Sequence, residues 1–337
     1  MTALPVADLE LVRVALGTHW QSLGGKKLFV TGGTGFFGAW LIESLLRAVD
    51  HDRVDVHATI LTRDARAFAE RSPYVADHPA IELLEGDVRS FEFPRGEFAF
   101  VIHAATDASA QLNESRPAEM FDTIVDGTRH VLDFAQRAGT QRLLLTSSGL
   151  VYGKQVVESV REDDATAPLP TDARSAYGEG KRVAELLCAM TPGVECLIAR
   201  CFAFVGPRLP LDRHFAIGNF IADALAGRAI EIRGDGTPLR TYLYAADLAV
   251  WLWTILFRGV PMRPYNVGSE TALSIREVAE RVANGVVPVQ VAGTPDPARP
   301  PERYVPSTER ARRELGLRET VDLDDAIART MAWHRAM

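Results

Sequence analysis

Tyr177 and Lys181 are the pair of side chains whose types and spacing most directly suggest chemistry. The segment SAYGEGKRVAELL favours a helix, and residues at i and i+4 share one helical face. A free tyrosine has a pKa of about 10, so it is a poor base at neutral pH unless a nearby cation favours the phenolate. Lys181 can be that cation, although a YxxxK spacing by itself also occurs as a surface pair without a role. We therefore interpret Tyr177 as a general acid–base whose pKa is lowered by Lys181.

A serine and two glycines support this interpretation. Ser148 follows the strand expected in LLLTSSGLVYG, at the carboxyl edge of a parallel sheet, where α/β proteins place their sites. From there its hydroxyl can hydrogen-bond the same substrate oxygen as Tyr177. Gly178 and Gly180 each cost the helix about 1 kcal/mol relative to alanine, which is tolerated where another group must approach closely. The predicted catalytic residues are therefore Ser148, Tyr177 and Lys181.

The segment TGGTGFFG has glycines at positions 32, 35 and 38, between an expected strand and an expected helix. One glycine permits the tight turn, one lets the backbone approach a pyrophosphate, and one lets the helix pack closely on the strand. The pyrophosphate would bind the exposed N–H groups at the helix N-terminus. This pattern predicts a dinucleotide site with contacts from Gly32, Gly35, Phe36, Phe37 and Gly38.

The ends of the next three strands should complete the dinucleotide site. The strand VHATILT runs into Arg63, where an acidic residue would bind the ribose 2′-hydroxyl of NAD. A cation there can hold a 2′-phosphate, so NADP is favoured and NAD remains possible; alternatively Asp64 binds the ribose and Arg63 is a solvated loop charge. His103 is interpreted as a hydrogen-bonded wall residue and not as a catalyst. The predicted contacts along these strand ends are Thr62, Arg63, Asp87, Val88, His103, Ala104 and Ala105.

These residues require a particular arrangement of strands and helices. Short apolar segments such as FAFVIHAA and QRLLLTSS alternate with helical segments, which predicts an α/β fold with a Rossmann-type, doubly wound parallel sheet. After residue 208 the alternation weakens, and the Gly-Asp-Gly at 234–236 suggests a hairpin in a smaller C-terminal substrate-binding lobe. We expect one N-terminal helical extension at 1–25, an NAD(P)-binding Rossmann domain at 26–207 and 239–262, and the substrate-binding lobe at 208–238 and 263–337.

The composition narrows the possible functions. The chain has 337 residues, with 37 Lys and Arg against 44 Asp and Glu, and a formal net charge of −7. That sign disfavours proteins that bind nucleic acid or anionic membranes through a basic surface. Three cysteines without a CxxC pair indicate neither a disulfide framework nor a zinc site, so no metal is expected. Without a long apolar run or a signal-peptide pattern, the chain is expected to be cytoplasmic.

Together these motifs resemble the extended short-chain dehydrogenase/reductases, and among them the nucleotide-sugar epimerase/dehydratase group. The resemblance covers about residues 26–320 and rests on TGGTGFFG, VIHAA, TSSGLVYG, YGEGK, GDGTPLRTYLYAADLA and ERARRELGL. It implies that Ser148, Tyr177 and Lys181 form a triad, with Lys181 also holding the nicotinamide ribose. It further implies a homodimer through two helices of each chain. The implied substrate contacts are Asn219, Phe220, Arg240 and either Arg299 or Arg303, with the arginines on the diphosphate.

Several departures from the family pattern bear on the reaction. Members that dehydrate at C5–C6 resemble a Thr-Asp-Glu arrangement where this chain has Ser148, Gly149 and Leu150, without a carboxylate to eliminate water. Ile124 and Ala203 stand where the family usually has asparagines, which alters the usual water or proton relay and the substrate-facing wall. The first departure disfavours 4,6-dehydration.

The resemblance thus implies an NAD(P)-dependent enzyme that acts on a nucleoside-diphosphate sugar. The preferred reaction is 4-epimerisation, in which the C4 hydroxyl is oxidised, the 4-keto sugar turns over, and hydride returns to the opposite face. A 4-keto-sugar reductase that consumes NADPH is the alternative. A non-catalytic NADP-binding module is a third interpretation, which the intact triad disfavours. The sugar and the nucleotide base stay open.

Overall fold

A seven-stranded parallel sheet forms the centre of the structure. The computed structural model describes residues 2–106, 110–211 and 215–337. The strands lie in the order β3-β2-β1-β4-β5-β6-β11, and all neighbouring pairs are parallel. This order confirms the predicted Rossmann-type α/β fold. The strands are β1 Lys26–Thr31, β2 Val56–Thr62, β3 Ile81–Glu85, β4 Phe100–His103, β5 Arg142–Ser148, β6 Glu195–Cys201 and β11 Tyr265–Val267.

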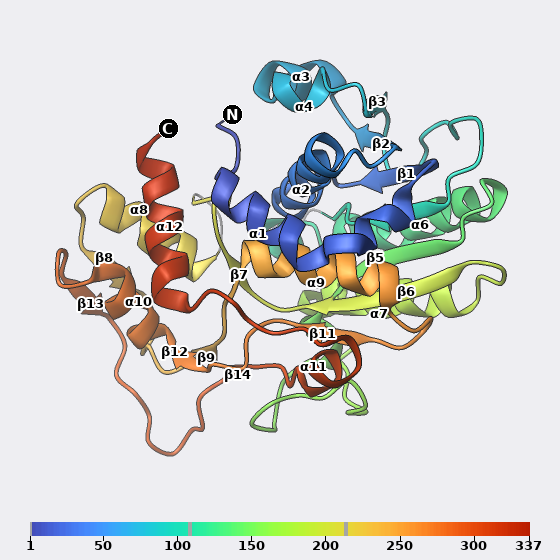
Figure 1. Cartoon of the computed structure of the whole chain (residues 1–337). Coiled ribbons are helices and arrows are strands. Elements are labelled where there is room, and N and C mark those ends of the chain that lie inside the picture. The colour runs from blue at the N-terminus through green and yellow to red at the C-terminus, as the bar shows by residue number, and fades with distance from the viewer. Residues whose placement is uncertain (1, 107–109, 212–214) are drawn as a thin grey trace.

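Helices cover both faces of this sheet (Figure 1). In β1, Leu28 and Val30 belong to one hydrophobic core, whereas Phe29 between them belongs to another. The first core contains buried residues of α1, α2 and α9, and the second contains those of α6 and α7. Both faces are buried, which explains the near-continuous apolar runs in the strands. The helices are α1 Val6–Leu16, α2 Phe36–Asp52, α6 Pro117–Arg137, α7 Ala176–Ala189 and α9 Ala245–Arg258.

The N-terminal extension packs on the first face, but it is not the single helix that the sequence suggested. α1 ends at Leu16, Gly17 has a left-handed φ of 48°, and a 3₁₀-helix continues over Gly17–Leu23. Glycine adopts that conformation at little cost, so the helix can end there. Trp20 of the 3₁₀-helix packs edge-on against Trp253 of α9, with ring centroids 5.1 Å apart. The extension therefore covers α9.

A second lobe gathers on the left of Figure 1, where α8, α10 and α12 lie beside short strands. Its strands pair as β10-β7, β12-β9-β14 and β13-β8. The hairpin suggested at 234–236 is wrong, because β8 and β9 on either side of it belong to different sheets. The elements are β7 Phe204–Val205, α8 Ala216–Leu225, β8 Ile230–Ile232, β9 Leu239–Arg240, β10 Leu243–Tyr244, β12 Leu273–Ser274, α10 Ile275–Ala283, β13 Val289–Val291, β14 Arg303–Tyr304 and α12 Leu323–Arg335. By contrast, α11 Glu309–Leu315 packs against β11 and α9 of the large-sheet part.

The last strand of the large sheet comes from beyond the expected domain boundary. The sequence places the end of the NAD(P)-binding part at residue 262, yet β11 follows that point and pairs with β6. The remaining elements belong to the segments that connect successive strands of the large sheet in the sequence. They are α3 Ala65–Arg71, α4 Pro73–Ala76, α5 Ala110–Ser115, and 3₁₀-turns at Gly149–Tyr152 and Ala173–Ser175.

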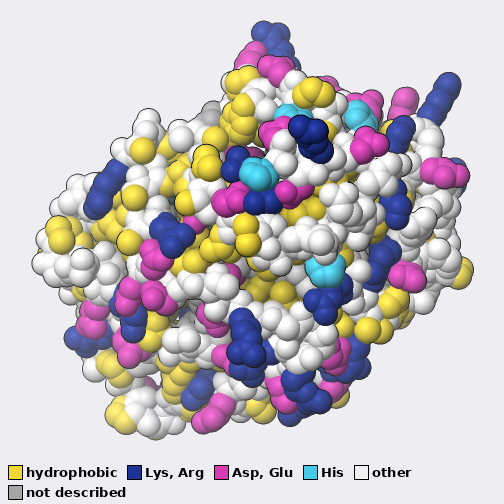
Figure 2. Space-filling view, in the orientation of Figure 1, with side chains coloured by type: hydrophobic (Ala, Val, Ile, Leu, Met, Phe, Trp, Pro, Cys, Tyr) yellow, Lys and Arg dark blue, Asp and Glu magenta, His cyan; other side chains and the backbone are white. Residues whose placement is uncertain are grey.

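The charged surface, the three cysteines and the lengths of the helices can be compared with the expectations from composition. On the face shown in Figure 2, basic and acidic side chains are interspersed and do not form one continuous basic surface. Cys188, Cys196 and Cys201 are free and buried. Within the part of the chain that the structure describes, no helix has both the length and the apolar character needed to cross a membrane.

Candidate active site

The strand order brings the predicted cofactor residues into a row along one edge of the sheet. Asp87 follows β3, Arg63 follows β2, the glycine turn follows β1, His103 ends β4 and Ser148 ends β5. Neighbouring strands lie about 4.8 Å apart, so the row spans roughly 19 Å from β3 to β5. The row includes the gap between β1 and β4. There the strand order reverses direction, which is where α/β folds bind ligands.

The glycine turn is shaped by close backbone contacts. Gly32 has a φ of 73°, and a Cβ there would lie 2.4 Å from the Ala104 carbonyl oxygen. A Cβ on Gly38 would lie 2.3 Å from the Gly32 carbonyl oxygen, so α2 can pack on the turn only without a side chain. Gly33, which the sequence pattern did not single out, is also constrained, because its Cβ would lie 2.6 Å from a β2 side chain. Gly35 is different: its Cβ would meet only an ordinary contact at 3.4 Å.

His103 is a buried, hydrogen-bonded wall residue. Its Nδ1 lies 2.8 Å from the Thr31 hydroxyl and its Nε2 lies 3.1 Å from the Thr128 hydroxyl. Thr128 donates its proton to the Ile124 carbonyl, so it accepts from Nε2–H, and Nδ1 accepts from Thr31. Burial lowers the pKa of His103 to about 3, and the charge of Lys181 acts in the same direction. The imidazole is therefore neutral, with a fixed tautomer.

Charged groups cluster after β2 and β3. Asp87 accepts two hydrogen bonds from the Arg89 guanidinium, at 2.9 and 2.8 Å, and these bonds lower its pKa to about 2. Arg63 is exposed and close enough to contribute to that lowering. Asp64 caps α3, accepting the Ala67 N–H at 2.7 Å. Arg89 is a second cation at this end that the sequence argument missed, although it stands two residues after Asp87.

Tyr177 and Lys181 lie on the same side of α7, as their spacing predicts. Lys181 is buried, and its Nζ donates to the Thr106 hydroxyl and to the Thr146 carbonyl oxygen, both at 2.8 Å. Nζ also lies 5.9 Å from the centroid of the Tyr177 ring. Gly178 allows the close approach that the sequence suggested, since its Cβ would lie 2.7 Å from the Leu150 carbonyl oxygen.

The effect expected of Lys181, together with an oxidised nicotinamide ring, on the pKa of Tyr177 stays a prediction, since Lys181 is not among the groups that shift this pKa in the structure. Burial raises the pKa of Tyr177 to about 12, and a hydrogen bond with Ser148 acts in the lowering direction. Lys181 uses two of its three N–H donors on Thr106 and Thr146, and its Nζ lies over the tyrosine ring. Its own burial lowers the pKa of Lys181 to about 8.

Tyr304 is an active-site phenol that the sequence argument missed. Its hydroxyl donates to the Cys201 carbonyl oxygen at 3.4 Å, and its ring packs on Phe202 with centroids 4.7 Å apart. Tyr304 pairs with Arg240 in the β14–β9 register. The motif TSSG held one usable signal, because a glycine directly after Ser148 marks a place where another group approaches closely.

The predicted substrate residues are placed less uniformly. Arg240 is partly exposed and lies 3.9 Å from Glu302, beside Tyr304. Because successive strand residues alternate, Arg303 faces the opposite side from Arg240. Arg299 is exposed in the preceding loop. In α8, Asn219 is exposed, whereas the Phe220 side chain is buried in the main hydrophobic core.

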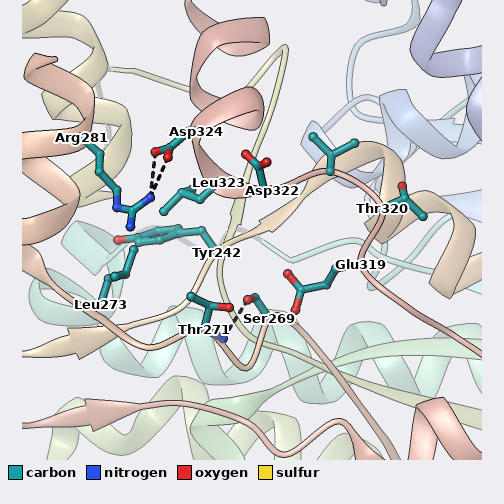
Figure 3. A pocket seen from close by; sticks show the side chains of 11 residues that line it. Tyr242, Ser269, Thr271, Leu273, Arg281, Glu319, Thr320, Asp322, Leu323 and Asp324 are labelled. Carbon is teal, nitrogen blue, oxygen red and sulfur yellow. Dashed lines mark hydrogen bonds and ion pairs between the residues drawn. The ribbon is translucent and has the colours of Figure 1, made fainter.

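A cavity of about 490 Å³ adjoins this region (Figure 3). Its lining residue Leu273 pairs with Arg240 across β12 and β9. The Tyr242 ring lies across the cavity, and an ion pair of 2.8 Å joins Arg281 to Asp324 on one wall. None of the predicted site residues lines this cavity.

Comparison with known proteins places this geometry in a family. Residues 28–268 match the sequence model of the NAD dependent epimerase/dehydratase family. The chain is also 32% identical, over 308 residues, to UDP-glucuronic acid decarboxylase 6 of Arabidopsis thaliana, covering 89% of this chain and 86% of that protein. The chain belongs to the NAD-dependent epimerase/dehydratase family.

Solved structures share the fold of this family member. UDP-N-acetylglucosamine 4-epimerase from Methanobrevibacter ruminantium superimposes with a TM-score of 0.79 at 18% identity, covering 93% of this chain and 99% of that one. A dTDP-glucose 4,6-dehydratase from Streptomyces venezuelae, solved with NAD bound, gives a TM-score of 0.77 at 24% identity, covering 92% and 97%. At these identities the likeness concerns the fold.

The glycine turn of this family member fits the pyrophosphate of a dinucleotide. No side chain caps α2 at the N-cap residue Gly35, so the first-turn N–H groups of Phe36, Phe37 and Gly38 are the groups that could bind an anion. The protein's own packing does not require glycine at position 35, since a Cβ there would make only an ordinary contact. A missing Cβ at that place keeps the approach to the turn open.

Proposed function

We propose that this protein binds NAD(P) and a nucleoside-diphosphate sugar and oxidises the sugar C4 hydroxyl, with 4-epimerisation as the net reaction. The observation that carries the proposal is the grouping of buried Ser148 and Lys181 with the partly buried Tyr177 at the end of the cofactor row. Tyr304 and Phe202 fill the space beside Gly149. Residues 148–150 contain no carboxylate, which argues against dehydration at C5–C6.

In the proposed mechanism the triad residues act on the sugar oxygen and the cofactor, and two arginines bind the diphosphate. Tyr177 takes the proton of the C4 hydroxyl, and Ser148 hydrogen-bonds the same oxygen. Lys181 holds the nicotinamide ribose with its third N–H, and its charge favours the phenolate once the site is filled. The bound dinucleotide supplies the hydride acceptor. Arg240 and Arg299 hold the diphosphate, a task that suits paired guanidinium groups in an acidic protein.

Decarboxylation is a second candidate, because relatives that match most of the chain are named UDP-glucuronic acid decarboxylases. The first step would be the same. Oxidation at C4 places a ketone β to a carboxylate on C5, and a β-keto acid loses CO₂ without an additional acid–base pair. The absence of a carboxylate at 148–150 is compatible with that course.

Turnover assays with Tyr177→Phe test the proposal. The substitution keeps the ring packing and removes the hydroxyl, so NAD(P) and nucleotide sugar should still bind. Turnover should fall by about 10²–10⁴, the contribution of a positioned general acid–base. Tyr74→Phe, remote from the triad in a hydrogen bond to Glu43, is the control and should retain turnover. Full activity of Tyr177→Phe would contradict the mechanism.

The products of the unmodified enzyme distinguish the candidate reactions. Epimerisation interconverts two C4 epimers of the same mass without net change in cofactor redox state. Decarboxylation of a nucleoside-diphosphate uronic acid releases CO₂ from the 4-keto acid; protonation at C5 and return of the hydride to C4 then give a nucleoside-diphosphate pentose. Stoichiometric loss of NADPH absorbance with a 4-keto sugar would instead identify a reductase.

We further infer that NADP is the preferred cofactor. Arg63 and Arg89 both lie near Asp87 at the adenosine end of the row. Asp64 already accepts the Ala67 N–H as the cap of α3, which leaves it less available to a ribose hydroxyl. A 2′-phosphate at this place would meet guanidinium groups.

A two-fold dimer through α6 and α7 remains our proposal for the assembly. Leu186 and Met190, one turn apart at the end of α7, are 56% and 60% exposed. The outer face of α6 is instead charged, with pairs such as Arg137–Asp133. A dimer would cover the α7 residues, and sedimentation of a monomer at micromolar concentration would contradict it.

A further inference from the structure

A row of polar side chains crosses three neighbouring strands on the α7 face of the large sheet. Ser147 of β5 pairs with Arg200 of β6, and Arg200 pairs with Asn266 of β11, in the parallel register. Leu145, two residues before Ser147, belongs to the core that contains buried residues of α6 and α7. Because successive strand residues alternate between the faces, Ser147 and its register partners face the same helices.

Glu185 of α7 binds two members of this row. The Ser147 hydroxyl donates to its Oε1 at 2.5 Å. Arg200 donates from Nε to Oε1 at 3.0 Å and from Nη2 to Oε2 at 2.7 Å. The ion pair is largely buried, with the side chains of Arg200 and Glu185 14% and 13% exposed. A guanidinium that binds a carboxylate through two parallel bonds fixes the orientation of the pair as well as its distance.

Arg200 is itself held on its other side. Its Nη1 donates to the Tyr152 hydroxyl at 2.9 Å and to the Glu162 carbonyl oxygen at 3.1 Å. The Tyr152 hydroxyl in turn donates to Asn266 at 2.8 Å. The guanidinium is therefore a fixed point of the sheet, and the carboxylate that binds it fixes the helix that carries Glu185.

The bond between Glu185 and Ser147 is the second of two links between α7 and the end of β5. The first is made by Lys181, whose Nζ donates to the Thr146 carbonyl oxygen at 2.8 Å. Glu185 lies four residues beyond Lys181, on the same face of the helix. A single link would let α7 rotate about it, whereas two links about 6 Å apart along the axis fix both its position and its rotation.

The part of α7 that carries Tyr177 depends on such support. Gly178 and Gly180 both lie between Tyr177 and Lys181. Glycine loses more conformational freedom in a helix than any other residue, so this part of α7 is weak in itself. Its geometry must therefore come from contacts with the rest of the protein, and the two links to β5 supply them.

The charge of Glu185 also acts on Lys181. Burial lowers the pKa of Lys181 to about 8, and Glu185 acts in the raising direction. Cys201 would act in that direction as a thiolate, but burial raises its pKa to about 12, so it is neutral near pH 7. His103 on β4 is neutral as well, since burial lowers its pKa to about 3. Glu185 thus supports the protonated form of Lys181.

We propose that Glu185 and Arg200 are positioning residues for the reaction: their ion pair links α7 to β5 and β6 and thereby holds Tyr177 and Lys181 in place at the end of β5. Neither residue touches the reacting atoms in this account. The inference rests on the proposed function of Tyr177 and Lys181.

Steady-state kinetics of Glu185→Gln, Arg200→Met and the double variant test the proposal. Each single variant should lower kcat at least about tenfold, because a small displacement of a reacting group is costly. KM for the nucleotide sugar should change little. The double variant should be no worse than the poorer single one, because both substitutions remove the same pair. An unchanged kcat, or losses that multiply in the double variant, would overturn the proposal.

A control variant separates the position of α7 from general stability. Asp8→Asn changes another buried carboxylate, on α1 at the opposite face of the sheet, which accepts from Arg329 at 2.6 Å. It should lower the melting temperature about as far as Glu185→Gln does and yet keep kcat. An equal loss of kcat in Asp8→Asn would overturn the proposal. If a variant of the pair does not fold, Ser147→Ala, which leaves the ion pair intact, should still lower kcat severalfold at little cost in stability.

Ligand titrations test the positioning of Lys181 without turnover. NAD(P) contains the nicotinamide ribose that Lys181 is proposed to hold, whereas ADP does not. Glu185→Gln should therefore raise the Kd for NAD(P) severalfold and leave the Kd for ADP unchanged. Equal weakening of both ligands, or an unchanged Kd for both, would overturn the proposal. Absence of turnover in an unmodified protein that binds NAD(P) would contradict the proposed function instead.

Discussion

The glycine turn at 32–38 and the segment 301–308 both reach the candidate site, but they are held in different ways. The turn is shaped by backbone atoms, with Gly32 against the Ala104 carbonyl and Gly38 against the Gly32 carbonyl. The segment is held by backbone hydrogen bonds with Val160 and Leu239 and, in addition, by the Gln155 and Asn266 amides, which bind its backbone groups. The turn therefore depends on the chain path alone, whereas the segment also depends on two side chains far away in the sequence.

This difference explains how one fold can serve many reactions. A backbone turn presents the same N–H groups whatever the surrounding side chains, so every dinucleotide-binding chain of this type can keep it. The position of a segment that is bound by side chains, and the residues it presents, can change when one of those amides or a neighbouring glycine is exchanged. We therefore expect the second lobe, more than the large sheet, to determine which substrate the protein binds.

Alanine in place of Gly38 should be the most damaging test of the backbone-held side. Its Cβ would lie 2.3 Å from the Gly32 carbonyl oxygen, so α2 must separate from the turn. We expect a loss of about 3 kcal/mol or more in the free energy of unfolding, measured by urea denaturation. Gly35→Ala is the matched control: its Cβ finds space, so it should fold normally and bind NAD(P) more weakly. A Gly38→Ala protein as stable as the unmodified one would contradict this account.

Asn266→Ala is the corresponding test of the side-chain-held segment. This buried amide accepts from Tyr152 and donates to the Val160 and Ser307 carbonyls, so its removal takes away the acceptor of the Tyr152 hydroxyl and a donor to each carbonyl. We expect a loss of about 2–3 kcal/mol in unfolding free energy. KM for the nucleotide sugar should rise while the Kd of NAD(P) stays constant. Gln290→Ala, an exposed amide on β13, should change neither; equal weakening of both ligands would remove the distinction between the regions.

The cofactor row could be predicted from the sequence because it depends on long, regular elements. Strands such as β1 and β5 contain short apolar runs, LFV and LLL, and parallel pairing places the carboxyl ends of neighbouring strands side by side. Ser148 at a strand end, and Tyr177 with Lys181 one helical turn apart, follow from the same periodicities. The place of Asp87 does too.

Tyr304 and Arg89 could not be found in that way. Tyr304 lies in a two-residue strand whose position is set by Gln155, 150 residues from the backbone group it binds. Periodicity carries no signal over two residues, and no local pattern links such distant partners. The missing hairpin at 234–236 has the same cause, since its flanking strands of two and three residues each pair with later segments.

The smallest effect that we expect is on the preference for NADP over NAD. It compares a side-chain contact, Arg63, with the backbone contacts of the glycine turn. Arg63 is exposed, so unlike the glycines it contributes by a side chain that costs the fold nothing to change. NADP should bind at least about tenfold more tightly than NAD, because charge-assisted hydrogen bonds to a phosphate are worth roughly 1.5–3 kcal/mol. Arg63→Ala should erase much of that ratio in a calorimetric titration. Arg66→Ala, an exposed arginine paired with Glu70 on the same loop-to-helix segment, should preserve it. Equal affinities in the unmodified protein would show that Arg63 is a solvated loop charge.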